Sequence, residues 1–163
     1  MSALLRVAHR ISPARFDADS SYLGTRLAGD RWVAVGDAAA FLDPIFSTGV
    51  LLAMQSGLDA AAAIDAGLAG GELSARHFAG YARLVRRRYR HFRRFAVAFY
   101  TPHFRDLWFW SGTRFGLYEA VLSVLAGNWR PSVATRLRIH VFFALVALQR
   151  LFPLPPRTHR SRE

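Results

Sequence analysis

The chain has 163 residues, 52% of them hydrophobic, so it is long enough for one domain with a substantial core, and its composition excludes a disordered chain. Its formal net charge of +11 comes from 22 basic residues, all of them arginine, which indicates an anionic partner or a compositional bias toward arginine. The absence of cysteine excludes disulfides, cysteine-based zinc sites and a thiolate nucleophile.

The histidines and the apolar runs narrow the class of protein further. The six histidines are scattered, and no two stand at the spacing that places metal ligands on one helix face, so no metal site is predicted. The longest apolar run, residues 141–148, is far below the roughly 18 residues that a membrane-spanning helix needs. We therefore expect a cytoplasmic protein, and contact with a membrane surface stays open.

The first part of the chain is predicted as β structure. Residues 3–9 and 31–36 are apolar runs of strand length, and residues 21–36 are typical of two strands joined by a turn around residues 28–30. The first 36 residues are therefore predicted to be mostly strand.

Gly36 ends the second apolar run, and Asp37 directly follows it. In a parallel α/β sheet this is the carboxyl end of a strand, where ligands bind, and an acid at this place accepts hydrogen bonds from ligand hydroxyl groups. The pair alone is also compatible with an ordinary turn between a strand and a helix.

A loop and a helix start follow the Gly-Asp pair. Pro44 fixes one backbone angle, and Ser47 is predicted as the helix N-cap. Thr48 and Gly49 then present unpaired N–H groups, which attract anions and electron-rich ligand edges. A side chain at position 49 would obstruct a flat ring.

Several helices are predicted after this loop. The first spans residues 48–66, followed by glycines at 67, 70 and 71 as a stop signal, and the second spans residues 74–100. Residues 102–151 are predicted to form two or three more helices, with breaks near residues 111–112 and at residues 127–132. In the second helix one face is apolar, with Tyr81, Val85, Tyr89, Phe92, Ala96 and Phe99, and the other carries Arg83, Arg86, Arg87, Arg90 and Arg94.

This separation of apolar and basic residues is typical of an amphipathic helix with one face on a core and one in solvent. It disfavours nucleic acid as a partner. Two partners for the basic face stay open. One is an acidic partner, such as a carrier protein or another part of a larger protein, and the other is a membrane surface.

The segment GDAAAFLDPIFSTGV, residues 36–50, resembles the second flavin-binding motif of FAD-dependent monooxygenases and, more closely, of flavin-dependent halogenases. It matches Phe-x-x-Pro-x-x-Ser-x-Gly, a halogenase pattern, and departs from the hydroxylase pattern at Ser47 and Leu51. The resemblance implies FAD as cofactor, with Asp37 holding the ribityl chain and a halide beside the amides of Thr48 and Gly49. The cofactor-binding residues implied in this way are Gly36, Asp37, Pro44, Ser47, Thr48 and Gly49.

The resemblance also implies a substrate class and partners. Phe46 stands where halogenases of free tryptophan have Glu, so the resemblance points to phenolic, pyrrolic or carrier-bound aromatic substrates, with a flavin reductase as partner. No catalytic residue is nominated. Tyr118 and Glu119 could line a substrate pocket, but the sequence does not distinguish them from ordinary helix residues.

Other family motifs are absent from these 163 residues. There is no G-x-G-x-x-G, no lysine and no Trp-x-Trp-x-Ile-Pro, and Trp108 and Trp110 are interpreted as core or interface aromatics. We therefore expect the carboxy-terminal part of a larger flavoprotein without its amino-terminal half, which corresponds to a truncated gene, a split subunit or an incomplete open reading frame.

The predicted fold class is α+β and mainly helical, as the carboxy-terminal fragment of an FAD-binding Rossmann-type fold. Residues 1–66 are predicted as the end of the FAD-binding domain, residues 67–157 as a helical region and residues 158–163 as a basic tail. The predicted function is that of a halogenase-like, FAD-dependent oxidoreductase. The alternative is a non-catalytic helical module that binds an acidic partner or a membrane surface through its arginine-rich face.

Overall fold

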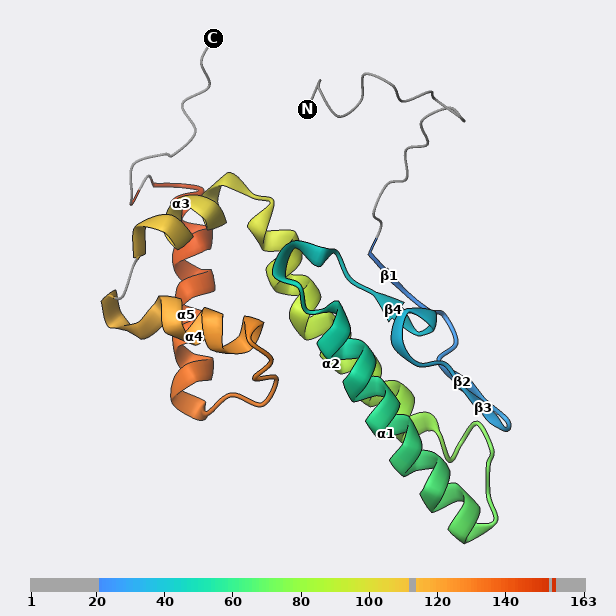
Figure 1. Ribbon diagram of the computed structural model, residues 1–163. Helices are drawn as coiled ribbons and strands as arrows, with labels where there is room; N and C mark the ends of the chain where they lie inside the picture. Colours follow the sequence, from blue (N-terminus) through green and yellow to red (C-terminus); the bar gives the residue numbers. More distant parts are fainter. Residues whose placement is uncertain (1–20, 112–113, 153, 155–163) are drawn as a thin grey trace, which may run out of the picture.

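The computed structural model describes residues 21–111, 114–152 and 154, and most of these residues are helical (Figure 1). The strands are β1 (Tyr22–Leu23), β2 (Ala28–Gly29), β3 (Trp32–Val33) and β4 (Ala40–Phe41). The helices are α1 (Gly49–Gly70), α2 (Ala79–Phe99), α3 (Pro102–Ser111), α4 (Leu117–Leu125) and α5 (Val133–Gln149), and the 3-10 turns are η1 (Gly36–Ala38), η2 (Pro44–Phe46) and η3 (Arg114–Gly116). The prediction of a mainly helical chain with short strands first is confirmed for the described residues.

The strands are shorter than predicted, and the predicted pair of strands joined by a turn is confirmed as β2 and β3. β1 pairs with β4 and β2 pairs with β3, both antiparallel, so the described residues contain no parallel sheet. The hairpin turns at Arg31, whose φ is 65°, slightly later than predicted. The run at 31–36 leaves the extended conformation at Gly36, whose φ of +55° starts η1. The strand expected at residues 3–9 lies outside the described residues.

α1 and α2 run side by side in opposite directions, with the strands on one side of the pair and α3, α4 and α5 on the other (Figure 1). α1 continues four residues beyond the predicted end and stops at Gly71, a C-cap in the left-handed conformation. α2 begins five residues later than predicted. The chain first forms a turn in which the hydroxyl of Ser74 accepts a hydrogen bond from the amide of His77.

The core lies mainly between α2 and the last three helices. The predicted apolar face of α2 is buried at all of its positions except Phe99, which is half-buried. Phe92 and Phe95 of α2 belong to the same buried cluster as Phe104 of α3 and Phe142 of α5. A second cluster joins α2 to the strands through Leu27, Ala39, Ala60, Tyr81 and Val85.

The two predicted breaks in the carboxy-terminal region are confirmed. α3 ends at Ser111, and α5 begins after Ser132, whose hydroxyl accepts a hydrogen bond from the amide of Thr135. In the described part of the chain, no helix has both the length and the apolar character to cross a membrane. The same residues contain no group of three or more His, Asp or Glu side chains that could hold a metal ion.

Candidate functional site

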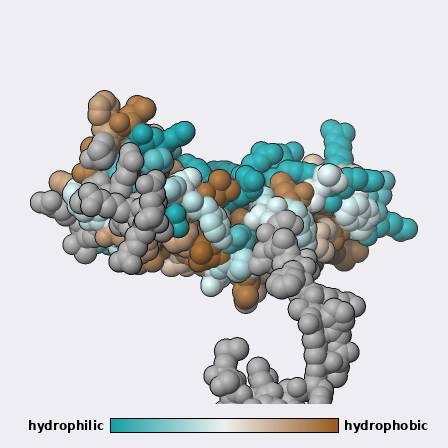
Figure 2. Space-filling model, turned by 90° about the horizontal axis from the view of Figure 1, so that it is seen from above, coloured by the Kyte–Doolittle hydropathy of each residue, from teal (hydrophilic) through white to brown (hydrophobic). Residues whose placement is uncertain are grey.

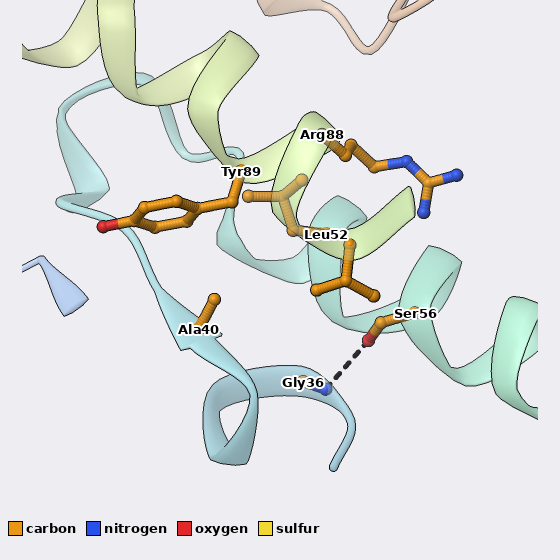
Figure 3. Close-up of a pocket in the computed structure, with 7 residues that line it drawn as sticks. Gly36, Ala40, Leu52, Ser56, Arg88 and Tyr89 are labelled. Atoms are coloured by element: carbon orange, nitrogen blue, oxygen red, sulfur yellow. Dashed lines mark hydrogen bonds between the residues drawn. The ribbon is translucent and has the colours of Figure 1, made fainter. Parts of the chain in front are cut away.

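Gly36 and Asp37 lie in a tight turn, η1, that is fixed from the side of α1. The Gly36 amide donates a 2.8 Å hydrogen bond to the hydroxyl of Ser56, which in turn donates to the carbonyl of Ala53 (Figure 3). The hydroxyl of Tyr22 donates to the backbone carbonyl of Asp37 at 2.6 Å. These bonds fix the backbone of the turn and leave the Asp37 carboxylate exposed, with no hydrogen bond or ion pair within the described residues.

The inner side of this turn is closed. A pocket of about 20 Å³ lies between η1, β4, α1 and α2, and its walls include Ala40, Leu52 and Tyr89 (Figure 3). This space holds about one water molecule. The side of the turn that is open to solvent is therefore the outer side, where the Asp37 side chain is exposed.

The loop before α1 is attached to the end of α2. The carboxylate of Asp43 accepts hydrogen bonds from the amide of Ile45 and from the hydroxyl of Tyr100. The ring of Phe46 packs edge-on against Phe99, with 5.2 Å between ring centres. Pro44 follows Asp43 as the first residue of η2, so this loop is held at both its backbone and its side chains.

The predicted N-cap at Ser47 is wrong. Ser47 lies in the left-handed region with a φ of 53°, and its amide donates to the carbonyl of Pro44, so it ends η2 and Thr48 is the N-cap of α1. Neither side chain caps the helix: Ser47 is exposed, and the hydroxyl of Thr48 is buried without a hydrogen-bond partner. The first amides of α1 are therefore uncapped donors.

Gly49 begins α1 in open space. A Cβ atom at this position would meet no atom within 4 Å. η1 packs against α1 at Ala53 and Ser56, four to seven residues beyond Gly49, which is about 6–10 Å along the helix axis. The turn that carries the exposed Asp37 carboxylate therefore packs about one to two helical turns from the uncapped start of α1.

Arg88 is a buried arginine that the predicted faces of α2 did not include. Its side chain is 4% exposed, forms an ion pair with Asp59 of α1 at 2.5 Å, and lies over the ring of Trp129. Burial, with a contribution from Asp59, raises the pKa of nearby Tyr81 to about 12. Position 88 is three residues after Val85 and four before Phe92, so the helical spacing of the apolar face already indicated that this side chain is buried.

The other aromatic and acidic candidates do not extend the site. Trp108 stacks on Phe104 and lies 4.6 Å from Tyr118, measured between ring centres, so these rings form part of the helical core. Trp110 and Glu119 are exposed.

The residues that sequence analysis missed at the turn and loop are Tyr22, Asp43, Ser56 and Tyr100. Of these, Asp43 had a recognisable signal, because it is an Asp before Pro at a turn.

Comparison of the sequence with known proteins identifies relatives of this chain. The family model described as "Tryptophan halogenase" matches residues 14–124, which include η1, the loop and the start of α1. A 1H-pyrrole-2-carbonyl-[peptidyl-carrier protein] chlorinase from Pseudomonas fluorescens is 32% identical over 96 residues, 59% of this chain and 21% of that protein.

Two further relatives match shorter segments. The corresponding brominase from Pseudoalteromonas luteoviolacea is 46% identical over 65 residues, 40% of this chain and 16% of that protein. A tryptophan 2-halogenase from Chondromyces crocatus is 48% identical over 56 residues, 34% of this chain and 11% of that protein. The chain thus spans about a fifth or less of the length of these relatives.

Proposed function

Because the chain belongs to the tryptophan halogenase family, we propose that it forms one side of the flavin site in an FAD-dependent oxidoreductase of the halogenase type. The observation that carries this proposal is the Asp37 carboxylate, exposed on a turn whose backbone is fixed by Ser56 and Tyr22. When bound, FAD supplies the redox chemistry, and the protein binds and orients it.

The residues around Asp37 fit the two chemically different parts of a flavin. Asp37 accepts hydrogen bonds from the hydroxyl groups of the ribityl chain, and the φ of +55° at Gly36 brings the turn into a shape that favours glycine. The open space at Gly49 leaves room for the flat ring beside the helix start. Pro44 and Ser47 shape the loop that leads to this start.

The uncapped start of α1 supports a halide near Thr48 and Gly49. The first amides of the helix have no side-chain acceptor from Ser47 or Thr48, and the helix dipole adds a partial positive charge at this end. We propose that these amides bind the halide.

The exposed face of α1 supports a second segment that completes the site. Val50, Met54, Leu58 and Leu68 are large apolar side chains of α1 that are exposed to solvent. The sequence also has no G-x-G-x-x-G loop to bind the pyrophosphate of FAD. We propose that a Rossmann-type segment with this loop packs on α1. Within the chain itself, we propose that residues 1–66 are the end of the FAD-binding domain, residues 67–157 a helical region and residues 158–163 a basic tail. The division at residue 66 falls inside α1, which runs to Gly70.

For the substrate, we propose a small or carrier-bound aromatic molecule, with a flavin reductase as the source of reduced FAD. Two relatives are named for pyrrole held on a peptidyl-carrier protein. In this chain the residue directly before Ser47 is Phe46, which packs against Phe99, so no carboxylate stands at that position.

The test is reconstitution of flavin binding. The full chain is co-expressed with the amino-terminal part of the Pseudomonas fluorescens relative, and the absorbance of bound flavin is measured in the purified complex. We expect bound FAD, and about a tenfold or larger loss of FAD affinity in Asp37→Ala, because a hydrogen bond to a charged group contributes about 1.5–3 kcal/mol.

The matched control is Asp65→Ala, which removes an exposed carboxylate from α1 away from η1. It is expected to bind FAD as the unmodified chain does. Equal FAD affinity of the Asp37→Ala and unmodified complexes would contradict the proposed role of Asp37, and a complex without flavin would contradict the proposed cofactor site.

A further inference from the structure

A basic pocket of about 540 Å³ lies between α2, the residues before α5 and α5 itself. This volume is in the range of sites for small organic ligands. Its lining contains no Asp or Glu. The arginines that line it are Arg87, Arg88, Arg90, Arg94, Arg130 and Arg136. Neither Asp37 nor the start of α1 lines this pocket, so it is a different cavity from the proposed flavin site, although Arg88 also lines the small pocket beneath η1.

The positive charge of this pocket is largely uncompensated. Of the six arginines, Arg88 alone forms an ion pair among the described residues, with Asp59. The other five guanidinium groups line one concave space and have no ion pair with an Asp or Glu of residues 21–111, 114–152 or 154. Like charges at such short range repel one another, and a bound anion relieves this repulsion. Figure 2 shows hydrophilic residues in a band along one long side of the molecule.

Aromatic packing holds several of these cations in place. Arg88 and Arg130 both lie over the ring of Trp129, at 4.6 and 4.2 Å from the ring centre, and Arg94 lies over Phe143 at 4.2 Å. A guanidinium that is already oriented loses less conformational freedom when it binds a ligand.

The buried part of the lining has unsatisfied polar atoms. Arg88 is 4% exposed, and its Nε has no hydrogen-bond partner among the described residues. The Nε2 atom of His91 is buried and equally without a partner. Buried polar groups without partners are rare in folded proteins and require an explanation such as a ligand that is bound in function.

We propose that this pocket binds a phosphate-class oxyanion, the phosphate or pyrophosphate group of a small molecule. Guanidinium groups match the oxygen atoms of phosphate in pairs, and several unpaired cations favour a multivalent anion over a single carboxylate. Pro131 and Ile139 add an apolar wall that suits the organic body of a phosphate ester. The concave shape, to which both α2 and α5 contribute, favours a small ligand over a polymer that would follow the exposed face of α2.

The test measures binding of inorganic pyrophosphate and of ADP to the full chain by calorimetry, at low salt and in a buffer without phosphate. The pocket variant Arg90→Gln/Arg136→Gln removes one lining arginine from α2 and one from α5. The control variant Arg83→Gln/Arg138→Gln removes two exposed arginines from the same helices, outside the pocket lining, with the same change in net charge.

We expect saturable binding of one pyrophosphate per chain. The pocket variant should lose affinity about tenfold or more, and the control variant less than about threefold. Circular dichroism checks that both variants are folded, and pyrophosphate should raise the Tm of the unmodified and control chains but not of the pocket variant. If the double variant does not fold, Arg90→Gln and Arg136→Gln are measured singly by the same criteria.

The two ligands distinguish the source of the phosphate group. Equal affinities for pyrophosphate and ADP indicate that the phosphates alone are recognised, and tighter binding of ADP indicates an organic phosphate whose body contacts the pocket. Absence of saturation with both ligands, or equal losses in the pocket and control variants, would overturn the proposal, since equal losses show diffuse attraction to the arginine-rich face.

Discussion

The hydroxyl oxygen of Ser56 lies 2.8 Å from the amide nitrogen of Gly36, and this hydrogen bond joins the third turn of α1 to the turn that carries Asp37. It is the contact through which the helix determines where the acidic side chain stands. The proposed flavin site depends on this bond, although Ser56 is buried and does not itself face a ligand.

We expect Ser56→Ala to loosen this turn. The substitution removes the acceptor of the Gly36 amide and should lower the free energy of unfolding by about 1 kcal/mol. Hydrogen exchange should become faster at the Gly36 amide than in Ser123→Ala, a control that removes a helical serine hydroxyl bonded to Asn128. Unchanged exchange at Gly36 would show that the Ser56 hydroxyl does not fix the turn.

Arg88 and Asp59 are expected to behave as a coupled pair. Arg88→Met should lower the free energy of unfolding by about 2–3 kcal/mol, because it leaves Asp59, whose side chain is only 24% exposed, without its partner. The double variant Arg88→Met/Asp59→Leu should recover most of this loss, since it removes both charges. Denaturation in guanidinium chloride measures both values, and a double variant less stable than Arg88→Met would contradict the coupling.

His91 should make the stability depend on pH. Burial, followed by the charges of Arg94 and Arg87, lowers the pKa of His91 in the folded chain below its ordinary value of 6.5. The unfolded chain therefore binds more protons between the two pKa values, and the free energy of unfolding falls as pH is lowered from above 6.5 through the folded-state pKa.

The comparison of His91→Gln with the unmodified chain isolates this effect. Urea denaturation at pH 7.5 and at pH 5.5 should show a smaller pH-dependent loss in the variant, because its side chain does not titrate. An identical loss in both chains would assign the pH dependence to other groups.

Tyr81 should ionise at a higher pH than an ordinary tyrosine, whose pKa is 10.0. Its hydroxyl donates to the backbone carbonyl of Ala34, and burial raises its pKa to about 12. The associated stability is present below pH 10 and is lost as pH rises through about 12, because the unfolded chain releases the proton first. In an ultraviolet titration Tyr81→Phe should lack the ionisation near pH 12 that the unmodified chain shows, and its free energy of unfolding should fall by about 1–2 kcal/mol at neutral pH. An unchanged ionisation near pH 12 in the variant would contradict this assignment.

Much of the helical region could be predicted from spacing. The apolar face of α2 and the breaks at Ser111 and before Val133 follow from periodicity and from glycine and proline, which act locally. The end of α1 was predicted too early, because Gly67 is tolerated inside the helix, where it is buried closely against Leu73 and His77.

The turn geometry at the candidate site could not be predicted in the same way. The motif located Asp37, but its support from Tyr22 and Ser56 comes from residues 15 and 20 positions away from their partners. Serine is a residue type typical of an N-cap, but Ser47 has the backbone angle of a turn end. The reason is that the loop docks on the end of α2 through Asp43 and Phe46. Contacts between distant segments decide such details, and residue spacing does not report them.

The exposed apolar face of α1 bears on how the amount of this protein is controlled in a cell. Chaperones and proteases recognise exposed apolar surface, so copies whose α1 is uncovered are candidates for retention or degradation. A copy in which the proposed Rossmann-type segment covers Val50, Met54 and Leu58 should therefore have a longer lifetime than a copy in which these side chains are exposed.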